Sequence, residues 1–235
     1  MTQRVPRRIA ARVDYTDVRK ELTYAEVEQA CHDAQEHKVA SIVVPSALVP
    51  LAVECLADAD VAVGCYIAYP FGTQSTRVKA REAEAAVAQG ATELELVPHH
   101  GTLRAGRWTE IEGELRTVRT AAGNALLKLA VELSYLADDE LATIARIAAE
   151  AGYRLLSNTA GFRTVSTRPE TEAAATPEAV ARILRAGGGI RPKATGGIRA
   201  AAEVVRLLDA GAERVTLHAA PSALRRLAKQ FEEAQ

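Results

Sequence analysis

The chain has 235 residues, of which 48% are hydrophobic, and its 29 basic and 30 acidic residues leave a net charge of −1. This composition can supply a large packed core, and the near-zero charge argues against nucleic acid or an anionic membrane as a partner. No apolar run reaches the length of a membrane span, and the basic N-terminus lacks the apolar stretch of a secretory signal. The three widely spaced cysteines, Cys31, Cys55 and Cys65, are typical of reduced thiols, so we expect a cytoplasmic protein without a metal or other cofactor.

Apolar runs of strand length alternate with amphipathic helical stretches along the whole chain. The expected strands cover residues 9–14, 39–44, 61–68, 93–97, 125–132, 153–157, 190–194 and 213–217. The expected helices cover residues 24–37, 46–58, 75–89, 108–122, 137–151, 176–187, 198–210 and 221–233. Several of these helices end at a glycine, which readily adopts the left-handed backbone found after a helix. The alternation predicts a single (β/α)8 TIM barrel domain over residues 1–235, with a doubly wound sheet as the alternative.

One polar connection is much longer than the others. Residues 163–175 follow the sixth expected strand and contain no helical or strand pattern. A polar connection of this length at the end of a barrel strand can act as a lid over an active site. An ordinary surface loop is an equally good interpretation of the sequence.

Several expected strands carry charged side chains where a buried strand would be apolar. Lys128 alternates with Leu127 and Leu129, and Glu95 alternates with leucines in the same way. Because the leucines must pack against the surrounding helices, the charged side chains should point into the barrel. Lys193 is expected there by the same argument. The residues expected to point into the lumen are Asp14, Glu95, Lys128, Glu132, Ser157 and Lys193.

These residues fall near the C-terminal ends of their strands, where barrel enzymes place their active sites. A lysine that is desolvated beside another cation has a lowered pKa and can act as a nucleophile or a base. A nearby glutamate can transfer protons. A structural ion-pair network that fills the barrel, or charged residues capping strand ends in water, are the alternatives.

Gly196 and Gly197 follow the seventh expected strand and precede a helix. Backbone N–H groups at a helix N-terminus can hold a phosphate or a carboxylate, and in barrels this anion site often follows strands seven and eight. A tight turn that requires a positive φ is the simpler interpretation of the two glycines.

Six stretches of the sequence are familiar in combination, although each is weak alone. They are VDYT at 13–16, VASIVVPSALVPLAVECL at 39–56, GATELELV at 90–97, LLKLAVELSYL at 126–136, NTAGF at 158–162 and PKATGGIR at 192–199. Together they resemble the deoxyribose-phosphate aldolase family over nearly the whole chain. The resemblance implies a (β/α)8 barrel that makes or cleaves a carbon–carbon bond through a lysine iminium (Schiff base) without a metal. It also allows a homodimer, because barrels of this family often pair through their outer helices.

The resemblance breaks at the residue that carries the family's chemistry. Ser157 stands where the family has its Schiff-base lysine, and a serine cannot form an iminium. Glu95 stands where the family has a proton-relay aspartate, while Lys128 and Lys193 match the family's other lysines. The resemblance therefore assigns catalytic roles to Lys193, Lys128 and Glu95, with Glu132 and Ser157 beside them.

The resemblance also implies which residues hold the substrate, but the substrate differs from the family's. Gly196 and Gly197 are retained, whereas the run after the last strand has lost hydroxyls and a glycine and has gained His218. This loss argues against a sugar phosphate. The expected substrate-binding residues are Asp14, Thr16, Asn158, Gly196, Gly197 and His218.

Three hypotheses of function follow. In the first, Lys193 or Lys128 has become the Schiff-base lysine of an aldolase or related lyase that acts on another small carbonyl compound. In the second, the site performs acid–base isomerisation, dehydration or cyclisation without a covalent intermediate, as a divergent enzyme of specialised metabolism would. In the third, the protein is a catalytically inactive ligand-binding homologue. We favour a lyase-like enzyme and leave the first two hypotheses level.

Overall fold

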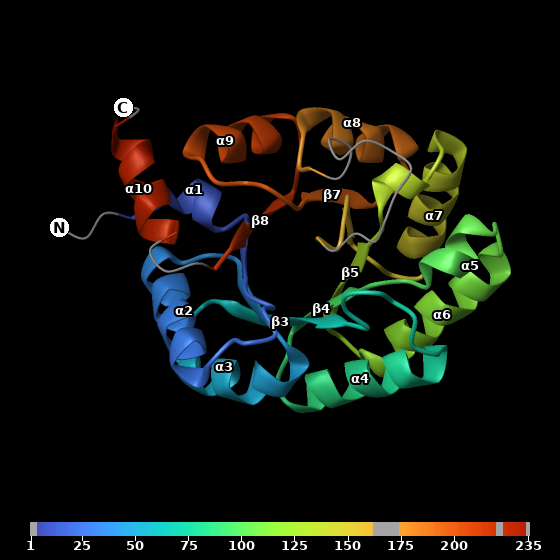
Figure 1. Cartoon of the computed structure of the whole chain (residues 1–235), viewed down its shortest axis with the longest axis horizontal. Coiled ribbons are helices and arrows are strands. Elements are labelled where there is room, and N and C mark those ends of the chain that lie inside the picture. The colour runs from blue at the N-terminus through green and yellow to red at the C-terminus, as the bar shows by residue number, and fades with distance from the viewer. Residues whose placement is uncertain (1–3, 162–173, 220–222, 234–235) are drawn as a thin grey trace.

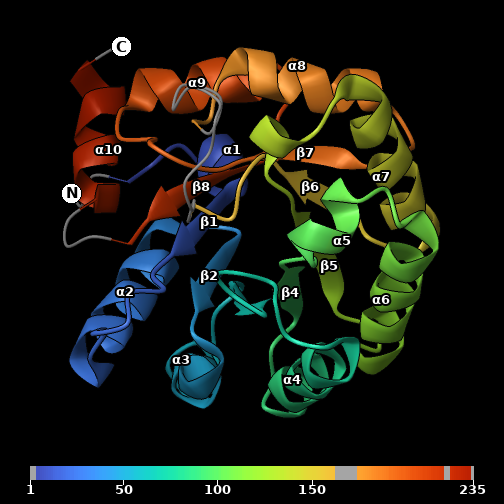
Figure 2. The same ribbon diagram turned by 45° about the vertical axis from the view of Figure 1, so that its right-hand side comes forward.

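The strands of this chain form a closed barrel. The computed structural model describes residues 4–161, 174–219 and 223–233. Neighbouring strands pair in parallel and in chain order, and β1 (Val13–Thr16) pairs with β8 (Arg214–His218) where the barrel closes (Figure 2). The strands between them are β2 (Ser41–Val44), β3 (Ala62–Ile67), β4 (Glu93–Leu96), β5 (Leu126–Ala130), β6 (Leu155–Ser157) and β7 (Arg191–Ala194). The predicted (β/α)8 barrel is confirmed, and the doubly wound sheet is excluded because this sheet closes on itself.

Helices surround the barrel on its outside (Figure 1). The helices that follow the strands are α2 (Tyr24–His37), α3 (Val49–Cys55), α4 (Thr76–Ala88), α6 (Trp108–Ala121), α7 (Asp138–Glu150), α8 (Pro177–Ala186), α9 (Ala201–Asp209) and α10 (Ala223–Glu233). Shorter elements are α1 (Arg7–Ala10), α5 (His100–Arg104) and the 3-10 helices η1 (Ser46–Leu48) and η2 (Leu133–Tyr135). Among the described residues, no helix is long and apolar enough to cross a membrane.

Two element predictions are wrong in part. Residues 7–10 form helix α1, so the first expected strand, 9–14, begins only at Val13. The apolar residues Ile9, Ala10 and Val13 are all buried, and their spacing fits one face of a helix as well as a strand. The helix expected from residue 198 begins at Ala201. Residues 163–173 of the predicted lid lie outside the described part of the chain.

Glycines end helices at points where another side chain would not fit. Gly90 and Gly211 both adopt a φ of 104° or just below, in the region that favours glycine. A Cβ at Gly90 would lie 2.9 Å from Val53, and one at Gly211 would lie 2.8 Å from Leu184. These two glycines therefore let α4 and α9 end and lead directly into β4 and β8.

The two faces of each strand carry different side chains. Leu94, Leu96, Leu127 and Leu129 are buried against the helices, as the alternation predicts. The other face of the strands points into the lumen and carries charged side chains. The next inward-facing residues toward the C-terminal ends of the strands form a smaller apolar cluster. That cluster consists of Val43, Tyr66, Val97, Ala130 and Ala160. The charged side chains are therefore covered, on part of the barrel mouth, by apolar ones.

Candidate active site

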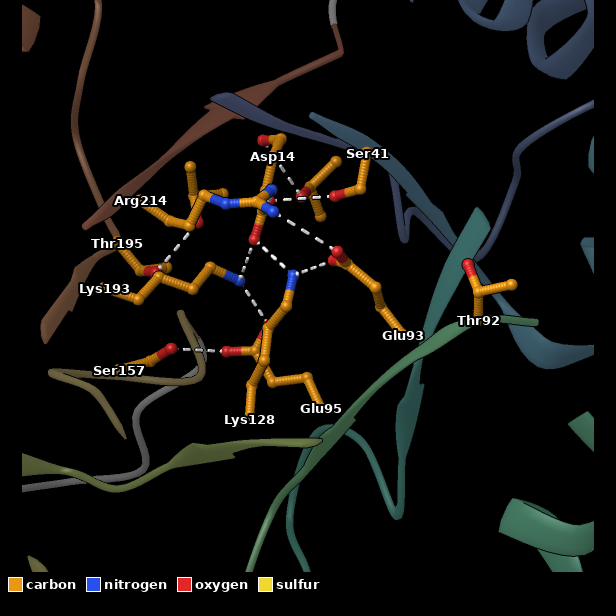
Figure 3. Close-up of polar contacts among 12 residues, drawn as sticks. Asp14, Ser41, Thr92, Glu93, Glu95, Lys128, Ser157, Lys193, Thr195 and Arg214 are labelled. Atoms are coloured by element: carbon orange, nitrogen blue, oxygen red, sulfur yellow. Dashed lines mark hydrogen bonds and ion pairs between the residues drawn. The ribbon is translucent and has the colours of Figure 1, made fainter. Parts of the chain in front are cut away.

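Six charged side chains from five strands meet inside the barrel (Figure 3). We call them the charged layer. Strands β1, β4, β5, β7 and β8 carry these residues, and the parallel register brings their side chains together. The charged layer consists of Asp14, Glu93, Glu95, Lys128, Lys193 and Arg214.

Lys193 contacts two carboxylates of the charged layer. Its side chain is fully buried, and its ammonium donates to Oε2 of Glu95 and lies 3.2 Å from Oδ2 of Asp14. Burial alone would lower the pKa of Lys193, but the carboxylates of Glu95 and Asp14 outweigh burial and raise it. The amine is therefore a cation at neutral pH, and a protonated amine is not a nucleophile.

Glu95 connects Lys193 to Ser157. The hydroxyl of Ser157 donates to Oε1 of Glu95 over 2.5 Å, while the other oxygen accepts from Lys193. Ser157 and Lys193 are also register partners on β6 and β7. Ser157, which the sequence resemblance aligns with the family's Schiff-base lysine, has no amine, and its register partner on the neighbouring strand β7 carries one.

Asp14 joins the two lysines. Its carboxylate lies 2.5 Å from Lys128, 3.2 Å from Lys193 and 2.8 Å from Arg214, and it accepts a 2.8 Å hydrogen bond from Ser41. Burial acts to raise the pKa of Asp14, but the three cations hold that pKa far below its usual value. Asp14 is therefore ionised at any pH at which the protein is folded and its cations are charged.

The deeper part of the layer is an ion-pair network that Arg214 and Glu93 complete. Lys128 lies 2.6 Å from Glu93, and Arg214 lies 3.3 Å from the same carboxylate. The layer thus contains three cations and three carboxylates, so its charges balance internally. Balanced charges are what a structural network requires. This observation keeps the structural alternative open for Lys128.

A cavity of about 850 Å³ opens at the C-terminal ends of the strands. Of the residues predicted to bind substrate, four line it, namely Thr16, Gly196, Gly197 and His218. Lys193 and Lys128 are not among the described residues that line it. Tyr66 does line it, and the Tyr66 ring centroid lies 5.8 Å from the Lys193 ammonium. The buried amine therefore lies directly behind a residue of the cavity wall.

The glycine pair lies at the cavity but not at a helix N-terminus. Gly196 and Gly197 have φ values of 104° and 76°, so both adopt the backbone that the tight-turn interpretation requires. Helix α9 starts at Ala201, four residues after Gly197. Both glycines line the cavity. Because α9 begins only at Ala201, they do not form its N-terminus, and the predicted anion site at a helix N-terminus is not found at these two residues.

Two predicted site residues hold the ends of strands together. The carboxylate of Glu132, just after β5, accepts from the Thr159 hydroxyl over 2.7 Å and from the Ala160 amide over 3.0 Å. The side chain of Asn158 accepts from the Thr195 amide over 2.7 Å and donates to the Thr195 carbonyl over 2.9 Å. These contacts fix the backbone after β6 and β7. The backbone groups that the two side chains bind belong to Ala160 and Thr195, which line the cavity.

Arg214 and Tyr66 lie at the site although the sequence did not predict them there, and Glu93 was predicted only to share the inward face of its strand with Glu95. Arg214 lies two residues before Thr216 and four before His218, so the strand period places it on the same inward face. Glu93 shares a face with Glu95 by the same rule. Tyr66 stands in an apolar run, and nothing in that run distinguishes it from a core residue.

Comparison with known proteins agrees with this geometry. No family model matches the chain. The chain is 35% identical over 213 residues to the deoxyribose-phosphate aldolase of Carboxydothermus hydrogenoformans (strain ATCC BAA-161 / DSM 6008 / Z-2901), which covers 88% of this chain and 90% of that relative. It is 36% identical over 205 residues to the deoxyribose-phosphate aldolase of Coprothermobacter proteolyticus (strain ATCC 35245 / DSM 5265 / OCM 4 / BT). That match covers 86% of this chain and 90% of the relative. A solved structure described as QR15, an aldolase, superposes with a TM-score of 0.84 at 27% identity over 96% of each chain.

Proposed function

The chain belongs to the deoxyribose-phosphate aldolase family, and from this premise we propose that it is a lyase-type enzyme that acts on a small carbonyl compound through Lys193 and Glu95. The observation that carries the proposal is the direct contact between these two side chains inside the barrel, with Ser157 bound to the same carboxylate. Aldol cleavage, dehydration and cyclisation all move a proton next to a carbonyl group, and an ammonium beside a carboxylate suits each of them.

In this proposal Lys193 acts as a cation. Its raised pKa keeps it protonated, so it stabilises negative charge that develops on the carbonyl oxygen. Glu95 takes and returns the proton, and Ser157 orients that carboxylate. Lys128 supports the pair by neutralising Asp14 and Glu93. Since Lys193 is buried behind Tyr66, the Tyr66 side chain must move aside when the substrate enters.

A second candidate keeps the family's covalent chemistry and moves it to Lys193. The register supports it, because the Lys193 backbone lies directly beside that of Ser157. Lys193 would first pass its proton to Glu95 and then attack the carbonyl carbon, and the carbonyl oxygen would leave as water when the iminium forms. The raised pKa of Lys193 opposes this route, which is why the acid–base route comes first.

A third candidate is a ligand-binding homologue without activity, and the internally balanced charged layer supports it. The retention of two buried lysines and a cavity in front of one of them favours an enzyme over this alternative. The exchange of the family's Schiff-base lysine for Ser157 also suits an enzyme that has been recruited to a specialised pathway.

The test follows α-proton exchange in D2O by ¹H NMR, with acetaldehyde, propanal, pyruvate and phenylacetaldehyde as probes. We expect exchange or condensation with at least one probe, and a loss of about a hundredfold or more in Glu95→Gln and in Lys193→Met. Glu150→Gln, on the exposed surface of α7, is the matched control and should keep full activity. Borohydride added during turnover separates the first two candidates: an adduct on Lys193 supports the iminium route, and its absence supports the acid–base route. If the folded wild-type protein exchanges no probe, the enzyme proposal is overturned in favour of the binding homologue.

A further inference from the structure

The cavity over the charged layer has two unlike sides. Strand β3 and the segment after it supply one side, which includes Tyr66, Tyr69, Pro70 and Phe71. The segments after β1 and β7 and the end of β8 supply the other, which includes Lys20, Arg199 and His218. A ligand that satisfies both sides must itself have two unlike parts.

The first side is aromatic. The ring centroids of Tyr66 and Tyr69 lie 4.8 Å apart with the rings tilted by 40°, and both residues pack into the apolar cluster at the barrel mouth. Phe71 remains 46% exposed beside them, although most large apolar side chains of the described chain are buried. A large apolar side chain at the rim of a cavity offers a flat surface on which a ring can stack.

The second side carries basic side chains. Lys20 and Arg199, which are cations, and the imidazole of His218 are exposed at the cavity, and no described residue that lines it carries a carboxylate. Arg19 is held by ion pairs of 2.8 Å with Asp17 and 3.0 Å with Glu26, and the Glu203 carboxylate, which accepts from the Arg199 amide over 2.8 Å, lies near Arg199. Because no described residue of this wall carries a carboxylate, the exposed ends of Lys20 and Arg199 attract an anionic group. Gly196 and Gly197, both with positive φ, also line this side.

The volume argues in the same direction. A cavity of about 850 Å³ lies in the range that holds ligands of the size of drugs, so an aldehyde of two or three carbons would leave most of it filled with water. We propose that the substrate is a carbonyl compound with an aromatic body that stacks on the β3 side and an anionic group that faces Arg199 and Lys20. This inference rests on the proposed function, because it names the substrate class of the same site.

Binding of defined probes tests the inference without requiring turnover. The probes are 4-carboxybenzaldehyde, which has both parts, 4-(hydroxymethyl)benzaldehyde, which has only the ring, and succinic semialdehyde, which has only the anion. Affinities are measured by calorimetry at one fixed salt concentration. We expect 4-carboxybenzaldehyde to bind about tenfold more tightly than either of the others. A parallel titration with 4-formylphenyl phosphate shows whether the anion site prefers a phosphate or a carboxylate.

Single substitutions assign the two parts to the two sides. Phe71→Ala should weaken both aromatic probes by about threefold to tenfold and leave succinic semialdehyde unchanged. Arg199→Gln should weaken both anionic probes and leave the neutral aromatic probe unchanged. Tyr24→Ala, at a tyrosine that is 70% exposed on α2, and Arg8→Gln, in α1 at the other end of the barrel, are the matched controls and should change nothing.

The inference is overturned if succinic semialdehyde binds as tightly as 4-carboxybenzaldehyde, if Phe71→Ala has no effect, or if no probe binds to the folded protein. These results differ from a failure of the proposed function. Two-part binding without any α-proton exchange would retain the substrate class and reject the enzyme. Exchange of acetaldehyde or pyruvate without aromatic binding would retain the enzyme and reject the substrate class.

Discussion

Ser157 on β6 and Lys193 on β7 are register partners, and both side chains donate to the same carboxylate, that of Glu95. A single carboxylate therefore receives a hydroxyl from Ser157, which the sequence resemblance aligns with the family's Schiff-base lysine, and an ammonium from the neighbouring strand. The chemistry of the site depends on which of these two positions carries an amine that can lose its proton.

Ser157→Lys should restore a reactive amine. The new ammonium would lie beside that of Lys193 and share Glu95 with it, and like charges at this distance lower the pKa of one partner. We expect borohydride treatment with acetaldehyde to leave an adduct on the peptide that contains residue 157 of the variant. Ser157→Met, which has a long side chain but no amine, is the control and should give no adduct there. A folded Ser157→Lys variant without an adduct would show that carbonyl compounds do not reach this depth of the barrel.

Glu95→Gln should lower the pKa of Lys193. Burial favours the neutral amine, Glu95 is the strongest influence in the other direction, and only Asp14 would remain to oppose burial. In the wild-type protein the raised pKa of Lys193 means that its ion pair stabilises the fold fully at any pH below about 10.4, the pKa of lysine in the unfolded chain. This contribution to stability is lost as the pH rises through the higher pKa of Lys193 in the folded protein. The ¹³C chemical shift of the Lys193 Cε, followed against pH, measures the pKa of Lys193 in the wild-type protein and in Glu95→Gln. A midpoint that is unchanged in Glu95→Gln, with Glu150→Gln as the control, would contradict the assignment of Glu95 as the main partner.

The alternation of side chains predicted much of the charged layer. Lys128, Lys193 and Glu95 lie in the lumen because the leucines on either side of Lys128 and Glu95 must face the helices. Local pattern carries this information, so sequence alone was sufficient. The same pattern contained Arg214 and Glu93, but both residues also fit the solvated end of a strand, and only the closed barrel shows that they meet Asp14 and Lys128.

Contacts between distant segments could not be predicted. Lys79 on α4 is fully buried and lies 2.9 Å from Glu114 on α6, outside the barrel lumen. The two residues are 35 positions apart in the sequence, and the residue pattern of neither helix predicts that they form an ion pair. A buried lysine among few lysines is therefore not in itself a sign of catalysis. Lys193 differs because it lies in the barrel lumen behind Tyr66, a residue that lines the cavity, whereas Lys79 lies between α4 and α6.

Asp14→Asn should destabilise the protein and change how its stability depends on pH. The substitution leaves Lys128, Lys193 and Arg214 without their shared carboxylate, and loss of one partner of a buried ion pair costs about 3–5 kcal/mol. Because the folded pKa of Asp14 is lowered, its contribution is present above the ordinary aspartate value of 3.8 and is lost as the pH falls below it. Urea unfolding between pH 7 and pH 2 should show that loss in the wild-type protein and a shallower one in the variant. Asp209→Asn, at an exposed position on α9, should behave like the wild-type protein, and equal acid slopes in all three proteins would refute the role of Asp14.

Asn158→Ala separates a role in positioning from direct substrate binding. The Asn158 side chain bonds both the amide and the carbonyl of Thr195, and each buried backbone group left without a partner costs about 1–3 kcal/mol. We expect the free energy of unfolding to fall by about 2–4 kcal/mol, measured by urea denaturation, together with weaker binding at the cavity because Thr195 lines it. Asn124→Ala, at an exposed position before β5, is the matched control and should change neither. If Asn158→Ala retained full stability and lost only ligand affinity, Asn158 would be a substrate ligand and not a clamp between β6 and β7.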